Sequence, residues 1–182
     1  MKALIKTIEV ISEVLGKWVS WLSLFMVIVM FLVVVLRYAF SLGWEGMQQS
    51  VTYMYAVFFL LGISYTQKHH GHVRVDIFYQ NFPPKGKALV DLVGTLLLML
   101  PMCGFIFWNS LDFVLLSWQT MESSNTAGGL PGVFILKSFL LVMPVLLFLQ
   151  GIAQILKILL WLRGELPHLA PYDAAEKQEA AA

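Results

Sequence analysis

The chain has 182 residues, of which 59% are hydrophobic and 13% charged, and its mean hydropathy is +0.77. This composition leaves too little polar sequence for a separate soluble domain and is typical of a membrane protein. The formal net charge of +1 gives little electrostatic attraction for nucleic acid, so we expect no nucleic-acid partner.

The first 17 residues combine charged side chains with an apolar stripe. Spacings of three and four residues separate the charges, which are Lys2, Lys6, Glu9, Glu13 and Lys17. The opposite stripe holds Leu4, Ile8, Ile11, Leu15 and Trp18. Residues 1–17 therefore predict an amphipathic helix that lies on the membrane surface. The acidic residues argue against a cleaved signal peptide, whose first region is basic.

Four uncharged segments follow, over residues 18–36, 46–67, 92–111 and 138–156. Each holds about 20 residues, enough for a helix to cross a hydrocarbon core of roughly 30 Å. Backbone groups in lipid must be satisfied within their own segment, so runs of this length indicate helices. We therefore predict an all-α membrane protein, a four-helix membrane bundle whose transmembrane helices cover about 18–40, 44–67, 86–117 and 133–162. A mobile cytoplasmic tail is expected over residues 164–182.

The basic residues predict the orientation of these helices. Ten of the twelve Lys and Arg residues fall before the first span, between the second and third spans, or after the fourth span. The two exceptions are Arg37 and Lys137. By the positive-inside rule, both termini and the central loop are expected in the cytoplasm.

Polar side chains in or beside the spans are the candidate interface or structural residues. Around the first outer turn they are Arg37, Trp44, Glu45, Gln48, Gln49 and Thr52, and Asp112 lies at the outer end of the third span. The fourth span carries Gln150 and Gln154, one turn apart. Intramembrane polar groups can mark a substrate path, but glutamines without a mid-depth carboxylate favour hydrogen bonds between helices. We expect Arg37 to pair with Glu45 or Asp112 near the outer membrane surface.

Three histidines follow the second span and invite comparison with a metal site. They are His69, His70 and His72, with Gly71 interrupting the segment. Zinc needs three or four ligands in tetrahedral geometry and no cysteine is near, so we predict no metal and no cofactor. A haem subunit would need histidines inside the helices, and all four histidines lie outside the spans.

Short motifs follow one another in a fixed order from the first span to the third. They are Arg37-Tyr38-Ala39-Phe40, Trp44-Glu45, Gly62, Gly71-His72-Val73-Arg74-Val75-Asp76 and Pro83-Pro84. Their order and spacing resemble the small membrane subunit, the DctQ family, of tripartite ATP-independent periplasmic (TRAP) transporters. The resemblance adds His72, Arg74 and Asp76 to the candidate interface residues. Gly46 departs from the family pattern, which commonly has a second acidic residue there.

The resemblance implies a non-catalytic subunit of a sodium-driven importer of an organic acid, of the sialic acid or C4-dicarboxylate type. Its implied partners are a large elevator-type membrane subunit, a periplasmic substrate-binding protein and membrane lipids, in the bacterial inner membrane. Spans without mid-membrane charge suit a scaffold better than an anion path. The alternative is a stand-alone four-helix channel, or a small transporter oligomer lined by the glutamines.

Overall fold

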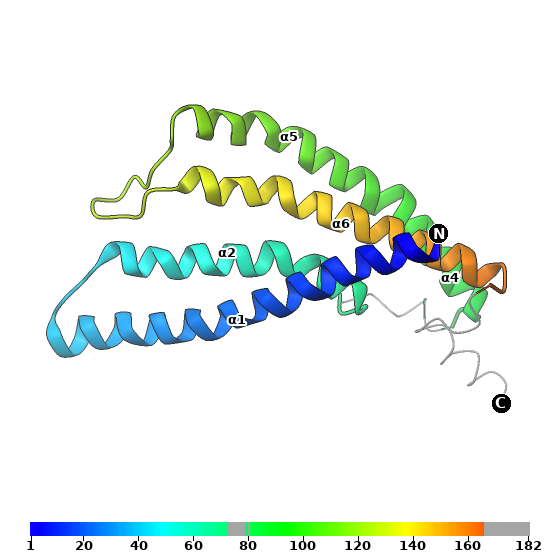
Figure 1. Cartoon of the computed structure of the whole chain (residues 1–182), viewed down its shortest axis with the longest axis horizontal. Coiled ribbons are helices and arrows are strands. Elements are labelled where there is room, and N and C mark those ends of the chain that lie inside the picture. Colours follow the sequence, from blue (N-terminus) through cyan, green and yellow to red (C-terminus); the bar gives the residue numbers. More distant parts are fainter. Residues whose placement is uncertain (73–78, 80, 166–182) are drawn as a thin grey trace.

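The computed structural model describes residues 1–72, 79 and 81–165, and every regular element among them is helical (Figure 1). The elements are α1 (Lys2–Phe40), α2 (Glu45–Lys68), α4 (Pro84–Gly94), the π-helical turn η1 (Thr95–Met99), α5 (Leu100–Gln119) and α6 (Val133–Leu162). This confirms the all-α prediction for the described part of the chain. The helices also agree closely with the predicted spans from the second onward.

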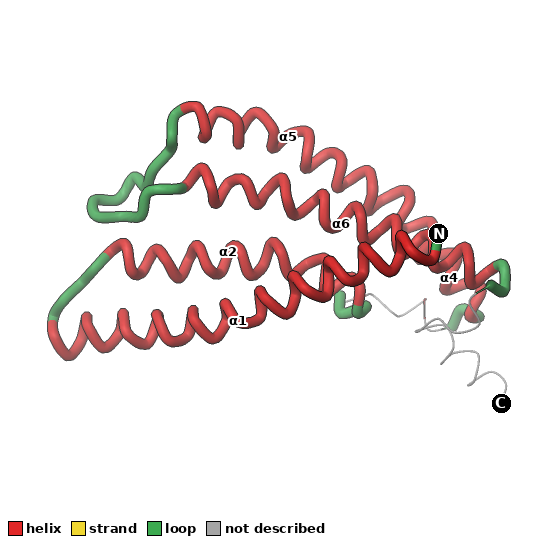
Figure 2. The backbone as a smooth tube through the Cα atoms, in the orientation of Figure 1, coloured by secondary structure: helices red, strands yellow, loops and turns green. Residues whose placement is uncertain are grey.

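The long helices lie in an open layer in the order α1, α2, α6, α5 (Figure 1). Helix α2 packs between α1 and α6, and α5 packs on α6. The turn after α1 and the loop after α5 lie at one end of the layer (Figure 2), and the N-terminus and the end of α6 lie at the other. Because the layer is open rather than a closed bundle, large apolar side chains such as Trp108 and Phe31 remain 75% and 66% exposed.

Three helical segments are long and apolar enough to cross a membrane: α1, the continuous segment Pro84–Gln119, and α6. Helix α2 has 24 residues, about 36 Å at 1.5 Å per residue, but its sequence is more polar. Its place between two neighbours offers a physical reason, since a covered helix presents less surface to lipid. The fourth span and the orientation of the termini stay predictions.

The first half of α1 differs from what the sequence suggested. Helix α1 runs for 39 residues without a break at residue 17. Its buried face is formed by Ile5, Ile8, Ser12, Gly16 and Val19, whereas Leu4, Ile11 and Trp18 of the predicted stripe are exposed. The apolar stripe is therefore largely exposed, while Glu13 and Glu9 pair with cations on α2 and α6. Its location at a membrane surface stays a prediction.

Prolines shape the segment Pro84–Gln119. Pro84 is the first residue of α4, where its missing N–H is not needed. Pro101 lies in the first turn of α5, directly after η1. A proline inside a helix clashes with the carbonyl four residues earlier, and the helix accommodates it by widening into a π turn. Gly151 of α6 packs against this turn, since an added Cβ would lie 3.4 Å from Thr95 Cγ2.

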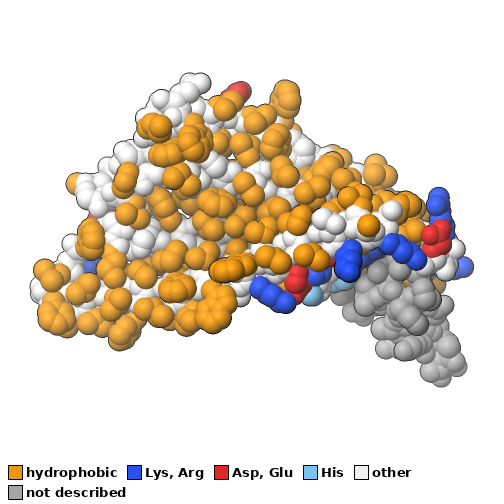
Figure 3. Space-filling model, in the orientation of Figure 1, with side chains coloured by type: hydrophobic (Ala, Val, Ile, Leu, Met, Phe, Trp, Pro, Cys, Tyr) orange, Lys and Arg blue, Asp and Glu red, His pale blue; other side chains and the backbone are white. Residues whose placement is uncertain are grey.

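Charged and apolar side chains separate along the molecule. On the face shown in Figure 3, Lys, Arg, Asp and Glu side chains gather near the end that holds the N-terminus, and hydrophobic side chains cover most of the remainder. An apolar body with one charged end is the pattern expected of a protein that sits in a bilayer and is held at one surface.

Candidate functional site

Helices α1, α2 and α6 meet in a polar junction toward the charged end. Ser12 of α1 donates a hydrogen bond to Gln150 Oε1 of α6 at 3.0 Å, and Gln67 of α2 donates one to Gln154 Oε1 at 2.6 Å. Gln150 and Gln154 are only 2% and 8% exposed. A buried amide without a partner costs free energy, so these bonds favour one register of the three helices.

Charged side chains surround this junction on α1 and α2. Glu13 Oε2 accepts a hydrogen bond from Lys68 Nζ at 2.5 Å and lies 3.1 Å from His69 Nε2. Its other oxygen lies 3.2 Å from Lys17 Nζ. Lys68 first, then His69 and Lys17, lower the pKa of the Glu13 carboxyl to about 2. This carboxyl precedes the uncharged span that begins at residue 18, and it stays ionised at any physiological pH.

A second ion pair joins α1 to α6. The carboxylate of Glu9 pairs with Lys157, and Lys68 also donates to the Glu9 main-chain oxygen at 3.2 Å. The side chains of the Glu13–Lys68 and Glu9–Lys157 pairs are only 18–26% exposed. Their effect here is geometric, because they hold the first half of α1 against both α2 and α6.

At the opposite end, the loop over residues 120–132, called here the outer loop, closes over the start of α2. Gln49 Nε2 donates to Ser124 Oγ at 2.8 Å, and Gln49 Oε1 accepts a hydrogen bond from the Leu130 backbone N–H at 2.7 Å. One side chain of α2 therefore satisfies groups at both ends of the outer loop. The predicted candidate Gln49 is a loop anchor in this structure.

Gly46 is buried beneath the outer loop. A Cβ at this position would lie 3.0 Å from the Gly128 carbonyl oxygen and 3.3 Å from Trp44 Nε1. A larger side chain would push the loop away from α2. The close approach of the loop thus gives a physical reason for glycine at the position where the resembled family commonly has an acidic residue.

A further ion pair holds the beginning of the outer loop to α6. Glu122 Oε2 accepts a hydrogen bond from Lys137 Nζ at 2.5 Å. The same ammonium lies 3.8 Å from the centre of the Phe113 ring, in cation–π contact with α5. The hydrogen bond from Lys137 lowers the pKa of Glu122, which lies in the loop outside the spans.

The expected ion pair of Arg37 is not formed. Arg37 Nη2 donates to Gln48 Oε1 at 3.2 Å, and among the residues that the structure describes it pairs with neither Glu45 nor Asp112. Arg37 nevertheless keeps part of the expected role, since its bond to Gln48 joins α1 to α2 near their shared turn.

The remaining predicted residues fall at separate places. Trp44 is the N-cap of α2 and is 70% exposed, and Thr52 is exposed farther along the same helix. His72 is half-buried beside a pocket between α1 and α2. Arg74 and Asp76 lie outside the described residues. No group of three or more His, Cys, Asp or Glu side chains in the described part of the chain is arranged to hold a metal ion.

Partners in the polar junction and in the ion pairs around it were not predicted from the sequence. Ser12, Lys68 and Lys157 were not singled out as contacts, although they join helices that are far apart in the sequence. The available signal was the pair Glu9 and Glu13, two acidic residues one turn apart in a segment that is otherwise basic and apolar.

A comparison with protein families identifies the family of this chain. The family model described as "Tripartite ATP-independent periplasmic transporters, DctQ component" matches residues 26–160. The chain belongs to the DctQ family. This confirms the resemblance and makes the chain a small membrane component of a TRAP transporter. Comparisons of this DctQ chain with curated proteins and with solved structures find no match.

The family match covers residues 26–40 of α1, all of α2, α4 and α5, and nearly all of α6. It includes the outer loop and the α2 and α6 sides of the polar junction. The α1 side of the junction in this DctQ chain, with Glu9, Ser12 and Glu13, precedes the matched region. The attachment of the first half of α1 is therefore described by the structure of this chain and not by the family model.

Proposed function

We propose that this DctQ subunit is a stationary, non-catalytic scaffold in a sodium-driven importer of an organic acid, of the sialic acid or C4-dicarboxylate type. It would pack beside the large elevator-type membrane subunit, which carries the substrate delivered by a periplasmic binding protein. In this proposal the substrate and the sodium ions pass through the large subunit.

The observation that carries this proposal is the use of the buried glutamines. Gln150 and Gln154 bond to Ser12 and Gln67 of neighbouring helices, and Gln49 bonds to the outer loop. A group that binds and releases an anion must be available to it, whereas these groups are engaged within the chain. The four uncharged segments also lack a carboxylate or ammonium at mid-depth. Both features favour a scaffold over a substrate-conducting subunit.

The shape of the helical layer supports the same role. Helix α1 has 39 residues, about 58 Å at 1.5 Å per residue, almost twice the hydrocarbon thickness. Its charged half is tied to α2 and α6 by Glu13 and Glu9. Exposed Trp18 and Trp21 follow this half, where aromatic rings favour the membrane interface. A helix held in this way would fix the depth and tilt of the subunit while a partner moves beside it.

The alternative of a stand-alone channel finds no support in the described residues. A pore lined by glutamines needs those side chains to face water or a second copy of the chain. Here Gln150 and Gln154 are buried against other helices of the same chain.

Co-expression tests the proposed partnership. The chain would be produced with the large membrane subunit encoded beside it, with an affinity tag on one subunit. We expect a stable complex after extraction in mild detergent, and no ion conductance when the chain is reconstituted alone. Failure to co-purify with the large subunit would contradict the scaffold, and conductance by the isolated chain would support the channel instead.

A further inference from the structure

A pocket of about 520 Å³ lies between α1 and α2, on the side of the array toward the charged end. Its volume falls within the usual range for sites that hold a small molecule. It is distinct from the polar junction, because none of its lining residues comes from α6. None of the predicted site residues except His72 lines it.

On its α2 side, the lining of this α1–α2 pocket changes from apolar to polar along its length. Phe58 and Phe59 lie toward the middle of α2, and Ile63 follows one turn later. Thr66 and His72 line the part near the charged end. Since α2 runs from the outer turn toward the charged end, the apolar wall lies deeper in the layer than the polar wall. An occupant that matches this gradient has a hydrocarbon part and a polar part.

A glycine keeps the pocket open on the α2 side. A Cβ added at Gly62 would meet no atom within 4 Å, so the space beside it is unfilled by protein. By contrast, Gly16 on the facing helix is in close contact with the Tyr65 ring. The two helices therefore touch at Gly16 and stand apart at Gly62.

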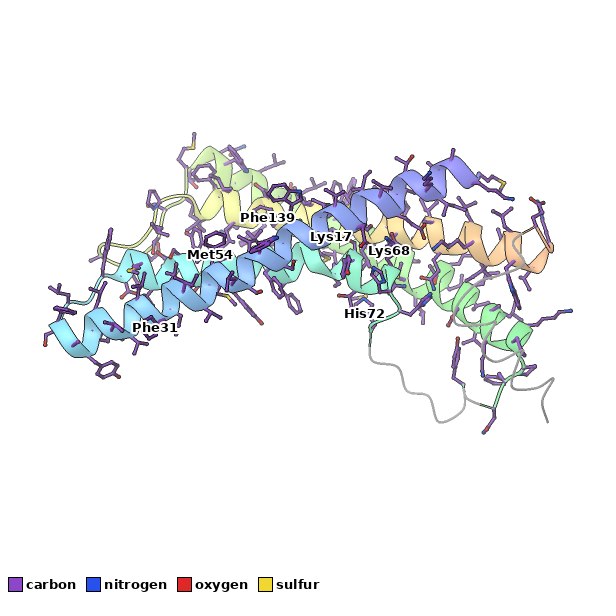
Figure 4. The ribbon with its side chains drawn as sticks, turned by 60° about the horizontal axis from the view of Figure 1, so that its bottom comes forward. Lys17, Phe31, Met54, Lys68, His72 and Phe139 are labelled. Atoms are coloured by element: carbon purple, nitrogen blue, oxygen red, sulfur yellow. The ribbon has the colours of Figure 1, made fainter. Side chains whose placement is uncertain are left out.

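Basic side chains stand at the polar end of the pocket. Lys17 follows the lining residue Gly16 and has a side chain that is 71% exposed. Lys68 lies near the end of α2, and Figure 4 shows it in the same region as Lys17 and His72. Glu13 balances one of these two lysines, so the Lys17, Lys68 and Glu13 side chains together carry one net positive charge on this side of the pocket.

We propose that this pocket binds one anionic phospholipid of the surrounding bilayer. An acyl chain would lie against Phe58, Phe59 and Ile63, and the headgroup phosphate would face Lys17 and His72. Basic pockets between membrane helices favour anionic headgroups, and the apolar wall excludes a fully polar solute. This site is a property of the chain itself and goes beyond its role as a scaffold.

Native mass spectrometry of the full chain in mild detergent tests the proposal, with equal amounts of phosphatidylglycerol and phosphatidylcholine added. We expect one retained phosphatidylglycerol, favoured over phosphatidylcholine by about fivefold, the factor that corresponds to one lysine near a phosphate. Gly62→Leu fills the pocket and should abolish this adduct. Gly104→Leu is the matched control, because an added Cβ at this α5 position also meets no atom within 4 Å, and it should retain the lipid.

A surface variant makes the test independent of pocket filling. Lys17→Gln should bring the two lipids to nearly equal retention while the circular dichroism spectrum stays that of a helical protein. The proposal is overturned if Gly62→Leu retains phosphatidylglycerol as the unchanged chain does, or if Lys17→Gln keeps the preference. It is also overturned if a Gly62→Cys chain crosslinks to the large subunit in a lipid-free complex, since a protein would then fill the pocket.

Discussion

Gly16 offers the sharpest mutational test of how α1 and α2 meet. A methyl group at this position would overlap the Tyr65 side chain, with Tyr65 Cβ only 2.8 Å away and two ring atoms nearer still. Because a Cβ is fixed by its own backbone, the clash cannot be relieved by rotating the ring alone. We expect Gly16→Ala to force α1 and α2 apart. Gly62→Ala is the matched control on the facing helix, since its added Cβ meets nothing within 4 Å.

The two substitutions share one free-energy term and differ in another. Replacing glycine by alanine inside a helix stabilises it by about 1 kcal/mol. Overpacking a close contact destabilises by about 1–3 kcal/mol. Both variants gain the first contribution, and only Gly16→Ala incurs the second. The free energy of unfolding should therefore be lower for Gly16→Ala than for Gly62→Ala by about 1–3 kcal/mol, or about 2–4 °C of Tm per kcal/mol for a chain of this length.

Thermal unfolding in detergent, followed by tryptophan fluorescence, measures this difference. The expected order of Tm is Gly62→Ala above Gly16→Ala, and separation of the helices should also weaken the Glu13–Lys68 ion pair. An equal Tm for the two variants, or a higher Tm for Gly16→Ala, would refute the close approach of α1 and α2.

Three further predictions concern the loop and the helix contacts. Gly46→Glu should detach the outer loop and make it susceptible to limited proteolysis, whereas Gly46→Ala should do so only slightly; equal cleavage of both would contradict the buried contact. The pKa of Glu122 is lower in the folded chain than in the unfolded chain. The pair with Lys137 therefore stabilises the fold fully above the unfolded carboxyl pKa of about 4.3. This stabilisation is lost as the pH falls through the lower, folded pKa. Between about pH 5 and pH 3, the range set by these pKa values, the Tm of the unchanged chain should fall more steeply than the Tm of Glu122→Gln. Parallel curves of Tm against pH for the two proteins would argue against the pair. A double-mutant cycle of Gln67→Leu and Gln154→Leu should give a coupling of about 0.6 kcal/mol, typical of hydrogen bonds between membrane helices, whereas no coupling would mean that the two amides do not interact.

The helices of this chain were predictable because lipid imposes length and apolarity on each segment independently. The predicted spans from residue 44 onward agree with α2, the Pro84–Gln119 segment and α6 within a few residues. Pro84 at a helix start follows from its missing donor, a strictly local property. The pairing of helices was harder to predict from the sequence. Apolar residues cover nearly all faces of a membrane helix, so their pattern does not indicate which face contacts a neighbour.

Contacts between distant helices decided what the sequence left open. Lys68 and Lys157, which pair with the acidic residues of α1, lie on other helices, so the face of α1 that packs within the chain could not be predicted from α1 alone. Arg37 donates a hydrogen bond to the side-chain amide oxygen of Gln48 and not to a carboxylate. Gly46 was recognised as unusual, but the loop that explains it approaches from more than 80 residues away along the chain, as the Gln49–Leu130 separation of 81 illustrates.

The most direct test of the scaffold is transport by proteoliposomes that contain the large membrane subunit, with and without this chain, under an inward sodium gradient and with the loaded binding protein outside. We predict substrate uptake only when both membrane subunits are present, and none from this chain alone. Full uptake by the large subunit without this chain would contradict the scaffold role, as would uptake by this chain without the large subunit.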